Sequence, residues 1–339
     1  MPVQEMPLLP GTLKNLFYPP EKDEYTYFAS ARTYPFAGAD KFVKAAWAAD
    51  ASTLAYARYG KQPMSEDDFK ENLQRGGLTD YTKIGDWAAP GTQGYFASNE
   101  HFAMLAFRGT EIDDAVAKFD DVDIVLVHEP DYRTAPGEAQ PALGHLSVIE
   151  HLFSLPCLVH RGFQRALNQV WDQVHGCVTA YRQKFPHAEI CFTGHSLGAA
   201  LAVLAFSRFA DAGISLFTVG CPRVGDQAFV KRALSGQSRG AFRFVNLNDP
   251  VAHIPLESCF YRHAPQECYR FDQDGNLGTD DGRFKGDVDA LRVAIAGLPG
   301  DFRSGLEKIQ APAGVVDHSP ARYSIRLWNW VTREARATA

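Results

Sequence analysis

The sequence lacks the features that identify membrane-spanning, signal-bearing and nucleic-acid-binding proteins. No apolar run is long enough to span a bilayer, and the first residues contain neither a basic segment nor the apolar stretch of a signal peptide. The net charge of −6 gives no basic surplus that would favour a nucleic-acid partner. We therefore expect a soluble protein, cytoplasmic by default, or secreted if a signal peptide has been removed.

Cysteine is scarce, with six residues spread over a chain of 339, too few for a dense disulfide framework. Cys191 and Cys221 fall in expected core strands, where cysteine behaves as a small hydrophobic residue. Cys259 and Cys268 flank a short polar stretch and could pair in an oxidising compartment. No cysteine–histidine cluster has the spacing of zinc ligands, so we expect neither a metal nor an organic cofactor.

The organisation of the chain favours one α/β domain. The composition is ordinary for a globular protein, with 45% hydrophobic residues, and neither internal repeats nor low-complexity tracts are visible. Strands and helices alternate over residues 160–250, which predicts a mainly parallel sheet flanked by helices. We expect residues 1–38 to form an extended arm over the surface, and residues 129–156 and 272–316 to be insertions.

Hydrophobic periodicity predicts the individual elements. The helical period predicts helices at residues 41–59, 161–185, 199–206, 226–234, 288–295 and 323–332. Apolar stretches of strand length predict strands at 94–98 and 101–107, joined as a hairpin, and at 122–127, 188–192, 214–219 and 242–247. A polar, hairpin-like region follows the last of these strands.

Ser196 lies between Gly194 and Gly198, after a predicted strand and before a predicted helix, which is the pattern of a nucleophile elbow. Side chains at the two glycines would collide with the neighbouring strand and helix. The backbone N–H of Leu197, at the start of the helix, points toward the space above the serine. The alternative is a turn that serves packing alone, and we expect the adjacent His195 to be structural.

A serine nucleophile needs a base and an acid, which in the α/β-hydrolase order follow it as Asp or Glu and then His. Asp249 follows the strand at 242–247, at the sheet edge where α/β proteins place functional residues. Its alternative role is a turn residue before Pro250. Asp226 follows a glycine turn, and we interpret it as a helix N-cap.

Three histidines downstream of the acid are candidates for the base: His253, His263 and His318. His253 lies only four residues beyond Asp249, too close to take the far side of the carboxylate. His263 stands in a polar stretch without distinguishing context. His318 opens the turn before the last helix, which is the placement expected for a base on a late loop.

Five segments occur in an order that resembles the class 3 lipases, the family of filamentous-fungal triacylglycerol lipases and feruloyl esterases. The ordered set is far more specific than any one motif, and the resemblance covers about residues 95–325. A further segment, at residues 317–323, looks like the closing histidine motif of the family and favours His318 as the base. The five segments are FRGT at 107–110, HRGF at 160–163, GHSLG at 194–198, GCPRVG at 220–225 and NDPV at 248–251.

The resemblance implies an α/β-hydrolase fold and a complete catalytic site. It makes Ser196 the nucleophile, Asp249 the acid and His318 the base. It also implies that Thr110, through its hydroxyl and N–H groups, joins the N–H of Leu197 as the oxyanion hole. Without the family context, residues 108–110 would be interpreted as a turn at the end of a strand.

Residues 111–119 carry the pattern of a short amphipathic helix, with Ile112, Val116 and Phe119 on its apolar face. In the family this position is a lid. A closed lid would cover the active site, and an open one would present its apolar face to a lipid surface. An equally good hypothesis places these side chains in the core.

The sequence therefore predicts a serine carboxylic-ester hydrolase, first of all a lipase that cleaves acylglycerols through an acyl-enzyme. Its expected partner is a lipid or other ester, with transient contact with a lipid–water interface. The alternatives are an esterase or phospholipase on other esters, an acyltransferase or peptidase with the same triad, and a non-catalytic lipase-like module like those in plant immune signalling. The insertions at 129–156 and 272–316 depart from the compact fungal pattern and could reshape the acyl pocket.

Overall fold

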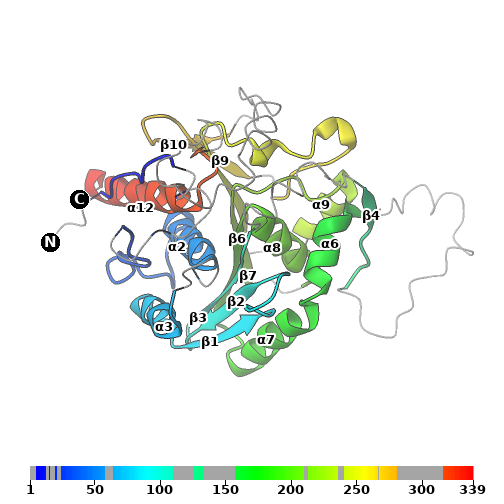
Figure 1. Cartoon of the computed structure of the whole chain (residues 1–339), viewed down its shortest axis with the longest axis horizontal. Helices are drawn as coiled ribbons and strands as arrows, with labels where there is room; N and C mark the ends of the chain where they lie inside the picture. The colour runs from blue at the N-terminus through cyan, green and yellow to red at the C-terminus, as the bar shows by residue number, and fades with distance from the viewer. Residues whose placement is uncertain are drawn as a thin grey trace, which may run out of the picture.

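A central sheet organises the chain in the computed structural model, which describes residues 5–12, 15, 20, 24–57, 64–109, 125–132, 157–209, 213–235, 240–265, 267–280 and 316–338. The sheet has eight strands in the order β1-β2-β3-β6-β7-β8-β9-β10 (Figure 1). These strands are β1 (Asp80–Ile84), β2 (Gly94–Ser98), β3 (Phe102–Phe107), β6 (Glu189–His195), β7 (Ile214–Val219), β8 (Ala241–Asn246), β9 (Cys268–Phe271) and β10 (Leu277–Thr279).

The middle of the sheet is parallel, from β3 through β6, β7 and β8 to β9, while β1, β2 and β10 pair antiparallel at the two edges. In this register Phe107 of β3 lies beside Gly194 of β6, and His195 lies beside Val219 of β7. The carboxyl ends of the parallel strands therefore meet at one edge, which is where α/β proteins bind ligands. The mainly parallel sheet and the hairpin over residues 94–107 are confirmed.

Helices cover both faces of the sheet (Figure 1). The helices α2 and α12 pack together on one face, and α6, α8 and α9 lie on the other. The described helices are α2 (Lys41–Leu54), α3 (Glu66–Arg75), α6 (Arg161–Asn168), α7 (Trp171–Lys184), α8 (Leu197–Arg208), α9 (Gln227–Leu234) and α12 (Pro320–Ala337).

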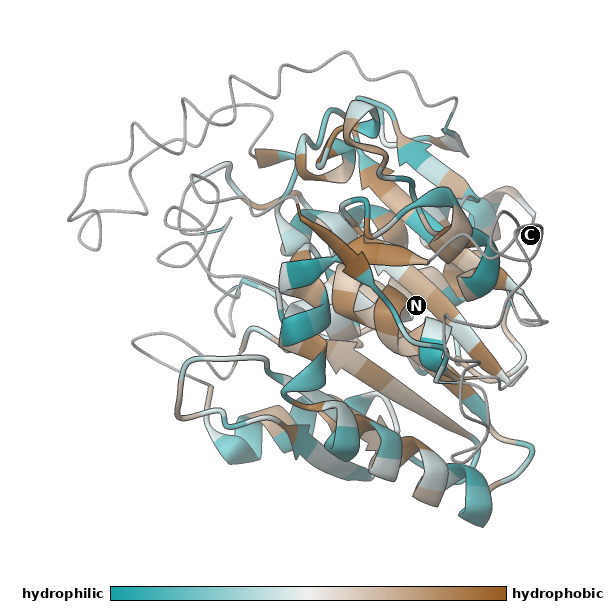
Figure 2. Ribbon diagram, turned by 90° about the vertical axis from the view of Figure 1, so that its right-hand side faces the viewer, coloured by the Kyte–Doolittle hydropathy of each residue, from teal (hydrophilic) through white to brown (hydrophobic). Residues whose placement is uncertain are grey.

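The helix α8 is enclosed by protein on all sides. Every residue from Gly198 to Arg208 is buried, and a helix that is apolar all round needs such a position. The sheet covers one side of α8, and α6 and α9 cover others. Apolar residues accordingly concentrate in the central strands and the helices against them (Figure 2).

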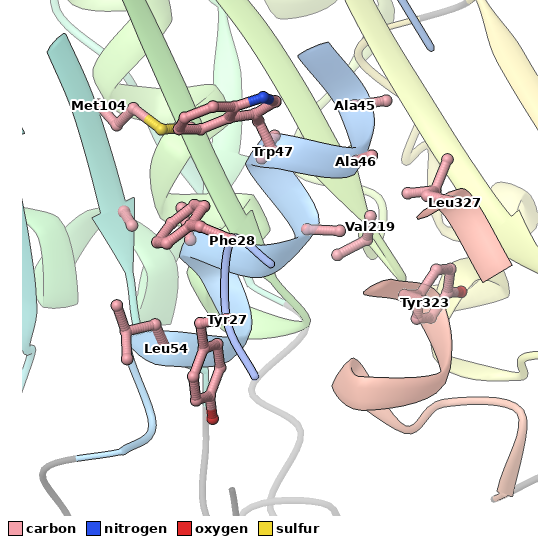
Figure 3. Close-up of a cluster of buried hydrophobic side chains, with 14 of the residues drawn as sticks. Tyr27, Phe28, Ala45, Ala46, Trp47, Leu54, Met104, Val219, Tyr323 and Leu327 are labelled. Atoms are coloured by element: carbon pink, nitrogen blue, oxygen red, sulfur yellow. The ribbon is translucent and has the colours of Figure 1, made fainter. Parts of the chain in front are cut away.

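The opposite face of the sheet holds a second apolar cluster, built around the alanine-rich helix α2. Buried alanines at 45, 46, 48, 49 and 51 let this helix approach both the sheet and α12 closely. The ring of Trp47 packs against Phe28, with their centroids 5.1 Å apart. Figure 3 shows members of the cluster contributed by the segment before α2, by α2, by the strands and by α12: Tyr27, Phe28, Ala45, Ala46, Trp47, Leu54, Met104, Val219, Tyr323 and Leu327.

A carboxylate lies within this apolar cluster. Asp50 of α2 has no solvent exposure, and its oxygens accept hydrogen bonds from four groups. The hydroxyls of Tyr25 and Ser324 donate to Oδ1, and the backbone N–H of Phe28 (2.7 Å) and the indole N–H of Trp328 (2.8 Å) donate to Oδ2. Burial raises the pKa of Asp50, although these donors oppose the shift.

The helix predicted at residues 161–185 is two helices, and the prediction of a single helix is wrong. The break falls at Val170, whose φ of −124° and ψ of 6° are not helical. Thr92, from the connection before β2, donates its hydroxyl to the carbonyl of Ala166 at 2.7 Å and lies against the side chain of Gln169. This contact comes from a residue far away in the sequence, so the periodicity of the segment could not reveal it.

The segment at residues 24–36 differs from the extended surface arm expected there. It folds into turns, and Tyr25, Tyr27, Phe28 and Phe36 are buried in the cluster around α2. Aromatic side chains of this size stabilise a fold chiefly by burial. The segment is therefore part of the core.

The prediction of a buried strand at residues 122–127 is also wrong for the residues that the structure describes, because the strand there is short and not buried. Here β4 (Leu126–His128) pairs with β5 (Leu158–His160) in a separate two-stranded sheet. Val125, before β4, is 43% exposed. Glu129, directly after β4, is fully buried and forms an ion pair with Arg208 at 2.7 Å. Residues 122–124, most of both insertions and the helix predicted at 288–295 lie outside the described residues.

All six cysteines are free thiols, so Cys259 and Cys268 do not pair here. The thiol of Cys268 instead donates to the carboxylate of Asp280 at 3.3 Å. Among the described helices, none combines the length and the apolar character that crossing a membrane requires.

The buried carboxylate of Asp50 gives a prediction about stability. In Asp50→Asn an NH2 group takes the place of one carboxylate oxygen, so the donors that met this oxygen lose their acceptor. A buried donor without an acceptor costs about 1–3 kcal/mol. We expect urea unfolding to show a loss of at least that size in the free energy of unfolding. The exposed Asp274 supplies a control, since Asp274→Asn should change stability by less than about 0.5 kcal/mol. Equal stability of the two variants would contradict this role of Asp50.

Candidate active site

Ser196 sits at the turn between β6 and α8 in a strained backbone conformation. Its φ of 58° and ψ of −127° are unusual for a residue with a side chain. The N–H group of Ser196 donates to the carbonyl of Val219 at 3.3 Å, which ties the turn to the end of β7. A serine held this way is presented at the carboxyl edge of the sheet.

The glycines around Ser196 are required by close backbone contacts. A Cβ atom at Gly194 would overlap the backbone of Gly198, and a Cβ atom at Gly198 would overlap the carbonyl of Phe107. The expectation that side chains at these positions would collide is confirmed. Gly109 is equally constrained, because a Cβ atom there would overlap the hydroxyl of Tyr56.

Asp249 and His318 are joined by a hydrogen bond of 2.8 Å between Oδ2 and Nδ1. The carboxylate is fully buried and accepts two further hydrogen bonds, from the hydroxyl of Tyr323 (2.6 Å) and the backbone N–H of Val251 (2.9 Å). Burial acts to raise the pKa of Asp249, but His318 and Tyr323 outweigh it and hold that pKa below its usual value. The carboxylate is therefore ionised at neutral pH.

Tyr323 is a residue that the sequence did not single out for the site. Burial, followed by the charge of Asp249, raises the pKa of its phenol well above the usual value. The hydroxyl therefore keeps its proton and donates it to Asp249, while it accepts from the N–H of Asn246 at 2.9 Å. The position of Tyr323 one turn into α12 is visible in the sequence, but its contact with β8 is not.

Gly220 fits against the Asp249–His318 pair. A Cβ atom at this glycine would lie 2.9 Å from Oδ2 of Asp249 and 3.1 Å from Nδ1 of His318. Its φ of +58° is also in the region that favours glycine. The glycine that opens the segment at 220–225 therefore makes room for the hydrogen-bonded pair.

His195 is buried and connects the elbow to the loop that carries His318. Its Nε2 lies 2.7 Å from the backbone carbonyl of His318, and its Nδ1 lies 2.8 Å from the hydroxyl of Tyr56. A carbonyl only accepts, so Nε2 carries the proton and Nδ1 accepts from the tyrosine. Burial, followed by the charge of His318, lowers the pKa of His195 far below its usual value. The neutral ring acts as a structural link, as the sequence suggested.

The other sequence candidates take different places. Asp226 is the N-cap of α9, and its Oδ1 accepts from the N–H of Phe229 at 2.7 Å. His253 ends the short helix η1 (Val251–His253), and its Nε2 lies 3.3 Å from a guanidinium nitrogen of Arg270. Of the three candidate histidines, His318 is the one that the structure joins to Asp249. His263 faces a separate cavity.

The oxyanion-hole and lid predictions are only partly within the described residues. Leu197 is the first residue of α8, where backbone N–H groups have no acceptor within the helix. The other four predicted residues, Thr110, Ile112, Val116 and Phe119, lie outside the described residues. Within the described ranges, no group of three or more His, Cys, Asp or Glu side chains could hold a metal ion.

The sequence is similar to known lipases over part of its length. The family model for lipase (class 3) matches residues 104–259. A secreted mono- and diacylglycerol lipase of Fusarium solani is 34% identical over 113 residues, which cover 33% of this chain and 34% of that protein. Secreted mono- and diacylglycerol lipase A of Penicillium cyclopium is 32% identical over 148 residues, 42% of this chain and 48% of that protein. The chain thus spans between a third and a half of these curated relatives.

Solved structures resemble this chain over a larger part of its length. Lipase II of Rhizopus niveus has a TM-score of 0.52 at 23% identity, covering 75% of this chain and 91% of that one. A lipase of Rhizopus microsporus var. chinensis has a TM-score of 0.50 at 22% identity, covering 81% and 90%. At these identities the likeness shows the fold, which is the α/β-hydrolase fold of the fungal lipases. The family match over residues 104–259 covers less than half of the chain, and over that part the sequence is similar to the class 3 lipases.

Proposed function

We propose that the protein is a serine carboxylic-ester hydrolase, and specifically a lipase that cleaves acylglycerols through an acyl-enzyme intermediate. The observation that carries this proposal is the hydrogen bond between buried Asp249 and His318. The pair lies at the same sheet edge as the strained elbow at Ser196. An acid that orients a histidine, beside a serine on an elbow, is the arrangement that acyl transfer requires.

The hydrogen bond to Asp249 sets the direction of proton transfer. Since the carboxylate accepts from Nδ1 of His318, Nε2 is left as the nitrogen that takes the hydroxyl proton of Ser196. The serine oxygen then attacks the ester carbonyl, and the resulting imidazolium gives its proton to the leaving alcohol. Water, activated by the same histidine, releases the acid from the acyl-enzyme.

The negative charge of the tetrahedral intermediate needs donors at a fixed position. The N–H of Leu197 is suitable because α8 begins there, directly after Ser196. Thr110 follows Gly109, which packs against the backbone carbonyl of His195, so the chain reaches the elbow at this point. We assign these two residues to the oxyanion hole.

Acylglycerols are the proposed substrate because two relatives are named mono- and diacylglycerol lipases. The same two names include "secreted", which favours secretion over the cytoplasmic location that the sequence suggested. A lipid–water interface would then be the place of action, with residues 111–119 as a lid whose apolar face carries Ile112, Val116 and Phe119.

Replacement of the nucleophile tests the proposed reaction. In Ser196→Ala we expect hydrolysis of p-nitrophenyl butyrate and of emulsified triglyceride to fall by at least about 10³-fold, since no acyl-enzyme can form. Ser258 is exposed, and Ser258→Ala serves as the control with unchanged rate. Undiminished hydrolysis in Ser196→Ala, or none in the unmodified protein, would contradict the mechanism. Transfer to an added alcohol that outpaces hydrolysis would indicate an acyltransferase instead.

The hydroxyl of Tyr323 gives a prediction about the pH dependence of the rate. Tyr323→Phe removes a donor from Asp249, so the pKa of this carboxylate rises and its attraction for the proton on the imidazole increases. We expect kcat to fall about tenfold, which corresponds to about 1.4 kcal/mol, with little change in KM. The acid limb of the pH–rate profile should move to higher pH. In Asp249→Asn the lost charge should move the limb to lower pH and cost far more activity. An unshifted limb in Tyr323→Phe would contradict this role.

The proposed lid predicts a dependence on the physical state of the substrate. We expect the rate on a short-chain triglyceride to rise sharply above its solubility limit, because the apolar face of an open lid is stabilised by the lipid surface. In the double variant Ile112→Ser, Val116→Ser that rise should shrink while hydrolysis of a monomeric ester persists. A rate that increases smoothly through the solubility limit would favour an esterase without an interfacial lid.

A further inference from the structure

A polar cavity lies beside the chain that follows β8, and neither Asp249 nor His318 lines it. Its volume is about 220 Å³. The chain from residue 250 to residue 265 forms much of its wall and belongs to the yellow segment near the top of Figure 1. The lining side chains are three arginines, two histidines and two carboxylates: Arg223, Arg243, Arg262, His253, His263, Glu257 and Asp280.

Two of the arginines present a buried N–H group that meets no acceptor among the described residues. Arg243, on β8, is only 6% exposed, and its Nη1 has no hydrogen-bond partner in the described part of the chain. Arg223 is 8% exposed, and its Nε likewise lacks an acceptor among the described residues. A buried guanidinium donor without a partner is costly. An anion in the cavity would relieve this cost.

The carboxylates of the cavity are already engaged with arginines, one of them with Arg223 of the cavity itself. Glu257 lies 3.3 Å from Arg223, and its side chain is 62% exposed. Asp280 binds Arg270 through two contacts of 2.9 and 3.1 Å. Among the described residues, no carboxylate forms an ion pair with Arg243. Glu257 offsets part of the charge of Arg223, whereas the charge of Arg243 meets no carboxylate in the described part of the cavity.

Arg262 and the two histidines complete the polar wall. The guanidinium of Arg262 is held by the carbonyls of Glu257 (3.1 Å) and Tyr261 (2.8 Å) through one nitrogen, Nη1. Burial, followed by nearby arginines, lowers the pKa of His253 to about 4 and that of His263 well below its usual value. Both rings are neutral at pH 7, so they do not add to the repulsion among the arginines, and each neutral ring has one N–H donor.

We propose that this cavity is a binding site for an oxyanion of the phosphate class, held by Arg223, Arg243 and Arg262. Guanidinium groups match the oxygens of phosphate in planar, paired hydrogen bonds. Three of them around one cavity suit a dianion better than a single carboxylate. The inference does not depend on ester hydrolysis, because it concerns binding at a site outside the proposed catalytic residues.

The rim of the cavity suggests where such a phosphate could come from. Leu256 and Phe260 flank the short helix η2 (Glu257–Cys259), and their side chains are 51% and 75% exposed. Apolar side chains beside a cationic cavity would suit the headgroup of a phospholipid at a membrane surface. Binding of free phosphate would require only the arginines of the cavity and not the apolar side chains at its rim. The two sources share the same chemistry in the cavity and can be separated by experiment.

Calorimetric titration with inorganic phosphate, at ionic strength held constant with chloride, tests the site. We expect saturable binding of one phosphate, weakened at least tenfold in both Arg243→Gln and Arg262→Gln. The exposed Arg165 on α6 supplies the control, and Arg165→Gln should bind like the unmodified protein. Because Arg262 is half-buried, its variant keeps the test valid if Arg243→Gln fails to fold. Acetate should not compete. No saturable binding, or undiminished affinity in a folded arginine variant, would overturn the proposal.

Vesicle sedimentation separates the two sources, with Ser196→Ala as the background so that lipid is not hydrolysed. If the source is a lipid headgroup, vesicles of phosphatidylcholine with phosphatidate should bind and phosphate should displace them. The additional changes Leu256→Ser and Phe260→Ser should then abolish vesicle binding while phosphate still binds. Phosphate binding without vesicle binding would support the site with free phosphate as its ligand. Vesicle binding that neither phosphate nor Arg262→Gln reduces, with no phosphate bound, would overturn it.

Discussion

The buried carboxylate of Asp50 is the interaction on which the arrangement of the site depends. It joins the segment around Tyr25, the helix α2 and the helix α12 through four buried hydrogen bonds. A buried carboxyl group is tolerated only where such donors surround it, so these hydrogen bonds hold the three segments against one another. This fixes α12, and with it Tyr323, which donates to Asp249 from the residue next to Ser324. The packing of the core thereby orients the acid.

The elbow obeys a different constraint, which is steric. Two glycine backbones at 194 and 198 approach each other and β3 so closely that no side chain fits. Gly220 does the same for the acid–histidine pair. Glycines at these positions thus allow the serine and its partners to come close together. The strand before Ser196 and the helix after it maintain its strained conformation.

The parts of the structure that depend on residues close together in the sequence could be predicted. The elbow, the hairpin at 94–107, the N-cap at Asp226 and the strand at 214–219 each follow from local pattern, and the structure has them. The order of acid and base after Ser196 left three candidate histidines, and the resemblance to the class 3 lipases favoured His318, which the structure joins to Asp249. The break at Val170 could not be predicted from the helical period, and the contact of Thr92 beside it comes from another part of the chain.

Tertiary contacts also explain what was missed at the site and in the core. The prolines and aromatic residues of the first 38 positions indicated an extended arm, whereas packing against α2 makes the aromatic residues around Phe28 part of the core. Tyr323 looks like any apolar position of an amphipathic helix until β8 lies beside it. The cavity lined by Arg243 is formed by four separate segments of the chain, so no single motif marks it. The role of residues such as Tyr323, which depends on contacts between distant segments, therefore could not be predicted from one sequence.

Two imidazole rings lie close together at the site, those of His195 and His318, with centroids 4.3 Å apart. If both could ionise in the working range, their titrations would be coupled and no single step would belong to either ring. Burial, reinforced by the charge of the neighbouring ring, keeps His195 neutral there, and its one proton is committed to the carbonyl of His318. His195 is therefore a neutral link between the elbow and the loop of His318, and its ring proton stays in the hydrogen bond to that loop.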